Sequence, residues 1–169
     1  MAKILLFPIY GNKLNYHLLN RNNIFNLRGK NSLVQNIDNL IFSAYSAAFQ
    51  IKKNLFVWKK IAVACGAKLT YFLQPFAPWI VKNYSAEEEL LFQYLDKKKT
   101  EIHSLMNEVL YREYIAKLQC ILDDFCVPLH DANAYLSKEA FDNKWLFVDR
   151  VHLTNNANKL MAEFILNRI

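Results

Sequence analysis

An aspartate and a histidine near the carboxyl end of the chain, Asp149 and His152, have the types and the spacing that acid–base chemistry needs. They stand three positions apart at the end of the apolar run Trp145–Asp149. A carboxylate on the same turn can hold an imidazole in one tautomer, and the imidazole can then act as a general base, by the logic of a Ser-His-Asp triad. The bare spacing is equally typical of a structural histidine beside an aspartate, so both interpretations stay open at this point.

The other residues that could do chemistry have simpler structural roles. His130 and Asp131 lie where a strand is expected to end, and Asp131 is better explained as the carboxylate that caps the next turn. His17 and His103 have no evident partner in the sequence. No serine follows a strand at a sharp glycine turn, so none is predicted as a nucleophile among Ser32, Ser43, Ser46, Ser85, Ser104 and Ser137.

Short apolar runs that alternate with long amphipathic segments predict the strands that would position such a site. Strands are expected at Ile4–Ile9, Leu69–Leu73 and Val127–Leu129, and Trp145–Asp149 is either a further short strand or an extended loop. Because strands joined by helical crossovers pair in parallel, we expect the first three to be parallel neighbours in that order.

A helical period fills the stretch between the first two strands. Apolar residues recur at steps of three and four from about Ser32, and Gly66 stands where a glycine would end the helix. The preceding stretch, Asn15–Lys30, is rich in asparagine and basic residues, which indicates a long loop or an irregular helix.

Two further helical regions begin at recognisable caps. Ser85 and Glu88 match a capping box, and the region that follows extends to about Asp124, either unbroken or interrupted near Lys97. Thr154 is the expected N-cap of the last helix. The inward positions of that helix are predicted to be Leu160, Met161, Phe164 and Ile165.

Length and composition indicate a single globular domain, residues 1–169, with no cofactor and no metal. The chain is 53% hydrophobic and has only three glycines, which argues against disorder. Cys65, Cys120 and Cys126 form no Cys-x-x-Cys pair, so a zinc site is not expected and the thiols are predicted to be reduced and buried in a cytoplasmic protein. No apolar run approaches the length of a membrane span.

The net charge of +6 does not by itself indicate a nucleic-acid partner. Its lysines are spread along the chain, with Lys52, Lys53, Lys59 and Lys60 on one expected helix. A solvated helix face explains these lysines better than a nucleic-acid groove, because no nucleic-acid-binding motif accompanies them. We therefore expect neither a nucleic acid nor a membrane as a partner.

The end of the chain resembles the last block of the SGNH/GDSL-type hydrolases. That block is an apolar run, Asp-x-x-His-Leu-Thr, a turn and a closing helix; here it reads Leu-Phe-Val-Asp-Arg-Val-His-Leu-Thr followed by Asn-Asn-Ala-Asn-Lys-Leu-Met. Upstream, Cys65–Pro75 and Val127–Asn133 are similar to the family's penultimate helix-to-strand step and last core strand. The resemblance covers roughly residues 55 to 169.

This resemblance implies a fold, an activity and two site residues. The fold is a three-layer α/β domain of the flavodoxin-like kind, with a short parallel sheet and long helices. The activity is hydrolysis of an ester or acetyl group through an acyl-serine intermediate. His152 would be the catalytic base, and Asp149 the acid that orients it.

The chain departs from the family at the nucleophile. The family's serine lies in a Gly-Asp-Ser motif, and this sequence contains none. The first strand ends at Gly11-Asn12, which resembles the family's Gly-x-Asn-Asp oxyanion block, so Asn12 is either the oxyanion asparagine or a plain turn residue. The resemblance therefore implies an incomplete, N-terminally truncated domain that is inactive by itself. The unpaired edge of Ile4–Ile9 would then favour self-association or a partner.

A non-enzymatic role on the same fold is the alternative function. The phrase Leu-Gln-Pro-Phe-Ala-Pro-Trp and the Asp-x-x-His block also resemble an SGNH-related group described as inducers of phenazine production, which suggests a regulatory or binding protein. The rings around Gln74 and Pro75 either line a pocket or pack in the core; they are Tyr71, Phe72, Phe76, Trp79 and Tyr84.

Overall fold

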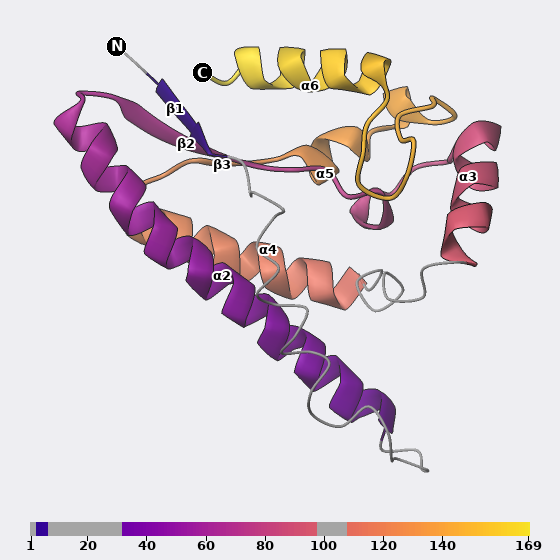
Figure 1. The fold of residues 1–169 in the computed structure, drawn as a ribbon, viewed down its shortest axis with the longest axis horizontal. Coiled ribbons are helices and arrows are strands. Elements are labelled where there is room, and N and C mark those ends of the chain that lie inside the picture. Colours follow the sequence, from indigo (N-terminus) through magenta and orange to yellow (C-terminus); the bar gives the residue numbers. More distant parts are fainter. Residues whose placement is uncertain (1–2, 7–31, 98–107) are drawn as a thin grey trace.

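The chain folds into an α/β domain with helices on both faces of a short parallel sheet (Figure 1). The computed structural model describes the backbone of residues 3–6, 32–97 and 108–169, and the side chains of residues 38–97 and 108–169. The strands are β1 (Lys3–Leu6), β2 (Lys68–Leu73) and β3 (Leu129–Asp131). The helices are α2 (Ser32–Ala64), η1 (Ala77–Trp79), α3 (Ala86–Asp96), α4 (Glu108–Asp124), α5 (Ala132–Leu136), η3 (Glu139–Phe141) and α6 (Asn155–Leu166).

The three strands are parallel neighbours in the order β1-β2-β3, which confirms the expected direction and order. Within the described residues, β1 covers only the start of the predicted strand; residues 7–9 lie outside them. β3 begins two residues later than predicted. The reason is local: Val127 donates its N–H to Leu122 in α4, and Pro128 has no N–H, so only the Pro128 carbonyl reaches β2.

The two faces of β2 belong to different hydrophobic cores. Leu69, Tyr71 and Leu73 pack with residues of α2 and α4, whereas Phe72 points the other way and packs with residues of α3 and α6. This alternation follows from the period of two along a strand. It produces three layers, with α2 and α4 on one side of the sheet and α6 on the other (Figure 1).

Two helices that lead into strands end in the same way. Gly66 has φ +62°, donates to Val63, and is followed by Ala67, which donates to Ala62. These two bonds form a Schellman motif, as the position of Gly66 predicts. The end of α4 repeats the motif with Cys126, at φ +50°, in the left-handed position.

The predicted caps and inward positions are confirmed. Ser85 and Glu88 form a reciprocal capping box at the start of α3, which ends at Asp96 near the expected break. Thr154 caps α6 by accepting the N–H of Ala157. Met161 and Phe164 are buried, and Leu160 and Ile165 pack against the same core.

The cysteine prediction is wrong about burial. Cys65, Cys120 and Cys126 are free and all exposed. Cys65 and Cys126 lie in the turns that end α2 and α4, and Cys120 lies on a solvent-facing position of α4. In the described parts of the chain, no helix has the combined length and apolarity that crossing a bilayer requires.

Candidate acid–base site

Asp149 and His152 form a hydrogen-bonded pair on the loop that precedes α6. Asp149 Oδ2 lies 2.7 Å from His152 Nδ1. The other carboxylate oxygen, Oδ1, accepts the backbone N–H groups of Val151 and His152, both at 2.7 Å. One carboxylate therefore shapes the turn and orients the imidazole at the same time.

The second ring nitrogen of His152 faces solvent. The His152 side chain is 73% exposed, and its Nε2 has no hydrogen-bond partner among the described residues. Because the Asp149 carboxylate can only accept at Nδ1, the neutral ring carries its proton there and presents a lone pair at Nε2. This is the orientation that a general base requires.

Hydrogen bonds favour the ionised form of Asp149. Partial burial is the largest single influence and raises its pKa, but the hydrogen bonds from Val151 and His152 together lower the pKa below its ordinary value. Asp149 therefore carries a negative charge at neutral pH. That charge would stabilise an imidazolium on His152 once the ring had taken a proton.

The loop that carries the pair closes on itself. Phe147 and Leu153 form a single antiparallel bridge, and the Val148 N–H donates to the His152 carbonyl at 2.9 Å. Trp145–Asp149 is therefore an extended loop with one bridge rather than a further strand. The bridge brings both ends of the Asp149–His152 turn together, so the turn has little freedom of its own.

Arg150, between the two paired residues, anchors the loop to the rest of the fold. Its buried guanidinium contacts the Asp96 carboxylate and lies 3.9 Å from the centre of the Phe92 ring, both on α3. Its main-chain oxygen accepts the N–H of Ala77 at 3.0 Å. Since Ala77 follows β2 closely, this bond places the Asp149–His152 pair at the carboxyl edge of the sheet.

Glu88 holds the entrance to the same loop from inside the protein. Its Oε1 accepts the N–H groups of Leu146 and Phe147 at 2.9 and 3.1 Å. Its Oε2 accepts the Ser85 N–H at 2.9 Å and the Lys82 ammonium at 2.7 Å. The side chains of Lys82 and Glu88 are both fully buried. A single carboxylate thus caps α3, pairs with a buried cation and fixes the start of the site loop.

Asn133 connects the ends of β2 and β3. Its buried Oδ1 accepts the Phe76 N–H at 2.8 Å. Asp131 accepts the Asn133 N–H, which confirms Asp131 as the cap of the next turn. Tyr111 on α4 donates to the other oxygen of Asp131, and burial, followed by this bond, raises the Tyr111 pKa above its ordinary value.

A cavity of about 670 Å³ adjoins the loop. Val148 and Thr154, on either side of the Asp149–His152 turn, line it, and so does Trp145. Its other walls combine apolar, amide and cationic groups from Lys144, Leu146, Asn155, Asn156 and Leu160. This lining offers both apolar contacts and hydrogen-bond partners.

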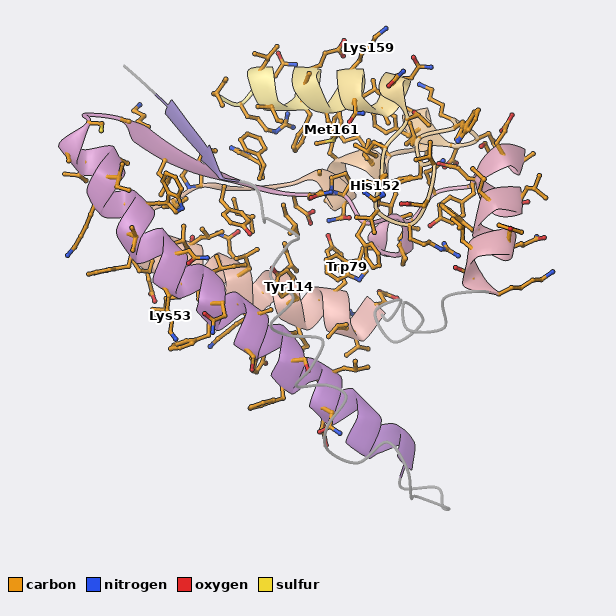
Figure 2. All side chains as sticks on the ribbon, in the orientation of Figure 1. Lys53, Trp79, Tyr114, His152, Lys159 and Met161 are labelled. Carbon is orange, nitrogen blue, oxygen red and sulfur yellow. The ribbon has the colours of Figure 1, made fainter. Side chains whose placement is uncertain are left out.

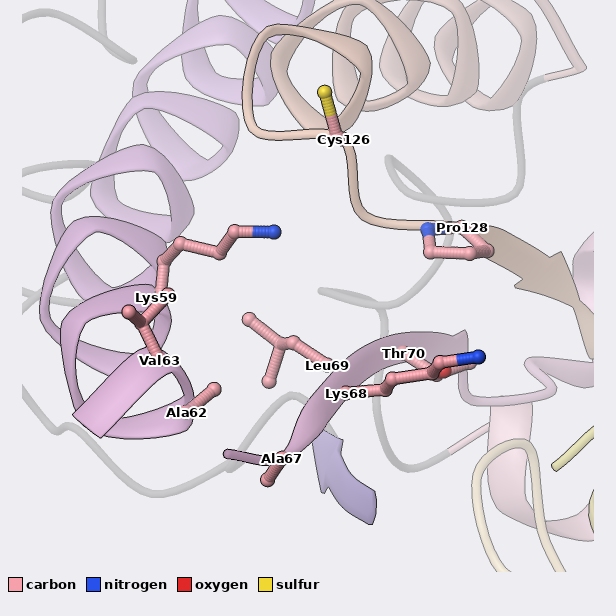
Figure 3. Close-up of a pocket in the computed structure, with 9 residues that line it drawn as sticks. All are labelled: Lys59, Ala62, Val63, Ala67, Lys68, Leu69, Thr70, Cys126 and Pro128. Carbon is pink, nitrogen blue, oxygen red and sulfur yellow. The ribbon is translucent and has the colours of Figure 1, made fainter. Parts of the chain in front are cut away.

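A smaller cavity of about 250 Å³ lies at the opposite, amino edge of the sheet (Figure 3). The Lys59 side chain extends from α2 into this space toward Pro128, and Lys68 and Cys126 also line it. It lies at the end of the strands away from Asp149 and His152, so it is separate from the acid–base site.

The other residues considered for the site are Gly11, Asn12 and the serines. Gly11 and Asn12 lie outside the described residues. Ser43, Ser85 and Ser137 have structural hydrogen bonds to or from the main chain. No hydrogen bond links His152 to a serine within the described ranges.

The aromatic residues near Gln74 pack on one another and on α4. Phe76 is buried against Trp79, with ring centres 5.1 Å apart. Trp79 in turn stacks on Tyr111 at 5.2 Å. Tyr84 donates its hydroxyl to the Ala77 carbonyl at 2.7 Å. Of the two interpretations, core packing is therefore the one these contacts support.

Sequence reasoning missed the residues that hold the loop. Glu88 was expected only as a capping residue, because its bonds to Leu146 and Phe147 span almost sixty positions. Nothing in the sequence around Lys82 indicated that its side chain would be buried and paired with Glu88. Arg150 could have been noticed as a cation directly after an apolar run and between two candidate site residues.

Comparison with known proteins leaves the family open. No protein-family model matches this chain, and no curated protein matches it. Within the described residues, no group of three or more histidine, cysteine, aspartate or glutamate side chains is placed to hold a metal ion. The function therefore has to be argued from the geometry of the site.

Proposed function

We propose that this chain carries the acid–base pair of an SGNH-type ester or acetyl hydrolase on a flavodoxin-like α/β fold. His152 is the base in this proposal, and Asp149 is the acid that orients it. The observation that carries the proposal is the 2.7 Å contact between Asp149 Oδ2 and His152 Nδ1, with Nε2 left open to solvent. Open α/β sheets bind ligands at the carboxyl ends of their strands, which is where this pair lies.

The chemistry of such a pair is the removal of one proton. His152 Nε2 would take the proton of a hydroxyl as that hydroxyl attacks an ester carbonyl, and Asp149 would stabilise the resulting imidazolium. The sequence has no Gly-Asp-Ser to supply that hydroxyl. We therefore propose that the chain alone hydrolyses acyl esters no faster than buffer.

Nitrogen NMR of the labelled protein tests the pair directly. Neutral His152 should be protonated at Nδ1 and bare at Nε2, and Asp149→Asn should abolish this preference because an amide can also donate. A His152 ring protonated at Nε2 in the wild-type protein would contradict the proposed role.

An assay on short acyl esters tests the missing nucleophile. Wild-type protein and His152→Ala should both match the buffer rate, and His130→Ala serves as the control for catalysis by any accessible imidazole. A wild-type rate that His152→Ala abolishes and His130→Ala retains would show that the chain has its own nucleophile and is a complete enzyme.

A non-enzymatic binding role on the same scaffold is the second candidate. It is favoured by Ser43, Ser85 and Ser137, which have structural hydrogen bonds, and by the cavity of about 670 Å³ beside the loop. Acetylated sugars and short acyl esters should then raise the melting temperature without being turned over. Trp145→Ala, which removes one wall of the cavity, should cancel that rise, whereas Trp58→Ala on α2 should not.

A further inference from the structure

Helix α2 has an apolar surface on the side that faces away from the protein. Its inner side buries Ala48, Leu55 and Ala62 in the core. On an exposed side of α2, next to these buried positions, residues recur at intervals of seven, which places them along one line of the helix. We call this line, together with the lysines between its members, the outer face of α2: Phe42, Phe49, Lys53, Phe56, Lys60 and Val63.

The apolar members of the outer face are unusually exposed for their type. Phe42, Phe49 and Phe56 are 72%, 55% and 53% exposed, and Val63 is also open. Scattered exposed apolar residues need no explanation, but a continuous row along about 30 Å of helix indicates a contact surface.

Lysines alternate with the phenylalanines on this face. Lys53 Nζ lies 5.2 Å from the centre of the Phe49 ring, and Lys60 Nζ lies 4.3 Å from that of Phe56. Lys53 projects from α2 away from the sheet (Figure 2). Each ammonium group thus lies beside an exposed aromatic ring. This arrangement is typical of side chains at a boundary between an apolar and an ionic environment.

Both charged members of the outer face are lysines. The sequence has no aspartate or glutamate from Asn39 to Ala86, whereas α2 alone has four lysines in its second half. A second copy of the chain would bring the same lysines, and α2 would contribute a single acidic group, Asp38, near its start. Self-association through this face would therefore oppose like charges, and an anionic surface is the complementary occupant.

In contrast to the expectation from the sequence that no membrane is a partner, we propose that the outer face of α2 docks on an anionic lipid surface. Phenylalanine rings would enter the boundary between headgroups and acyl chains, while Lys53 and Lys60 reach the lipid phosphates. The helix would lie in the plane of the surface and bind from one side only. The proposal does not depend on any role of Asp149 and His152.

Two other anionic partners fit the face less well. A single-stranded nucleic acid would stack its bases on the rings, but the cations of Lys53 and Lys60 already occupy positions over them. An acidic protein segment would need a groove for its own side chains, and the outer face is the convex side of one helix. A lipid surface needs neither a free ring face nor a groove.

Sedimentation with vesicles tests the proposal. The purified chain should bind vesicles of phosphatidylcholine and phosphatidylglycerol in equal parts, bind phosphatidylcholine alone much less, and dissociate as salt rises. The double variant Lys53→Gln/Lys60→Gln should weaken binding roughly 30-fold, since each lysine near such a surface contributes about 1 kcal/mol. Phe49→Ser/Phe56→Ser should weaken it by more than about tenfold, because two rings no longer enter the lipid.

Matched variants separate the outer face from general charge. Lys52→Gln/Lys59→Gln removes the same charge from the sides of α2, where Lys52 pairs with Asp124 and Lys59 lines the amino-edge cavity. Leu90→Ser removes an exposed apolar side chain from α3. Both should bind nearly as the parent does, and circular dichroism should show all variants folded.

Three results would overturn the proposal. Equal losses of vesicle binding in the two double-lysine variants would mean that the attraction depends on net charge and not on the outer face of α2. Equal binding of the two kinds of vesicle would exclude a requirement for anionic lipid. Failure to bind the mixed vesicles would exclude a lipid surface as the partner. The face would then belong to a second copy of the chain, to an acidic protein segment or to a nucleic acid. Whichever of self-association, poly-glutamate binding or oligonucleotide binding is lost in Phe49→Ser/Phe56→Ser would identify that partner.

Discussion

The carboxyl and amino edges of the sheet are held by different kinds of interaction. At the carboxyl edge, the buried side chains of Glu88 and Asn133 bind main-chain groups far away in the sequence, and the buried guanidinium of Arg150 contacts the Asp96 carboxylate. At the amino edge, the chain turns from helix to strand through local backbone bonds at Gly66 and Cys126. The loops of the carboxyl edge therefore depend on tertiary structure, and the turns of the amino edge on local conformation.

This difference fits a division of roles between the edges. Under the proposed function, a loop that presents Asp149 and His152 in one geometry needs support from several elements, because a catalytic pair tolerates little displacement. A turn that only reverses the chain needs no such support. Substitutions at the carboxyl edge should accordingly have large effects that reach the site, whereas those at the amino edge should be small and local.

The largest effect is expected for Glu88→Gln. The substitution leaves the Lys82 ammonium buried without its counter-charge and weakens the bonds to Leu146 and Phe147. Breaking a buried ion pair from one side costs about 3–5 kcal/mol, which denaturant unfolding would measure. The NMR signals of His152 should shift as well, because the site loop loses its support.

Glu89→Gln is the control for that substitution. Glu89 is the exposed neighbour on the same helical turn, so its replacement should change the free energy of unfolding by less than about 0.5 kcal/mol. If both variants had the same free energy of unfolding, the buried Lys82–Glu88 pair would not be the interaction that stabilises the carboxyl edge.

A smaller loss is expected for Asn133→Ala. The substitution leaves the buried Phe76 N–H without an acceptor, which costs about 1–3 kcal/mol. Asn158→Ala, at an exposed position of α6, should be nearly neutral and serves as the comparison. Similar denaturation curves for the two variants would mean that Asn133 does not tie the ends of β2 and β3 together.

The success of the sequence predictions also depends on whether an interaction is local or tertiary. Ser85, Gly66 and Thr154 were placed correctly because caps and helix ends obey short-range rules, and the strand order followed from alternation. The Asp149–His152 pair was predictable because its members are three residues apart. Glu88 and Arg150 could not be assigned their roles, since their partners come together only when the chain folds.

Acidification should weaken the fold through His130, at the carboxyl end of β3. Burial, and secondarily the charge of Arg168, lower the pKa of this ring below its ordinary value of 6.5. The unfolded chain therefore takes up the proton more readily, so stability attributable to His130 is complete above about pH 6.5 and decreases as the pH falls below that value. The ring is only partly buried, which keeps the effect small.

Denaturant unfolding at several pH values measures this contribution. The midpoint of the wild-type protein should fall more between neutral and mildly acid pH than that of His130→Gln, whose side chain does not titrate. Parallel curves for the two proteins would assign the acid sensitivity to other groups.

The smallest effect is expected at the amino edge, where Cys126→Gly should stabilise the protein. Cys126 has φ +50°, a conformation that costs a residue with a β-carbon about 1–2 kcal/mol and a glycine almost nothing. Its exposed side chain contributes little packing, so the gain should be about 0.5–1 kcal/mol after the extra freedom of glycine in the unfolded chain is subtracted.

The reverse change, Gly66→Ala at the equivalent position of α2, should destabilise the protein by a similar amount. The added methyl group meets no atom within 4 Å, so only the backbone conformation opposes the substitution. Thermal unfolding of the two variants and their combination should show opposite shifts that add, as expected of independent local turns. A shift of the same sign in both would show that these turns depend on tertiary contacts, as the loops of the carboxyl edge do.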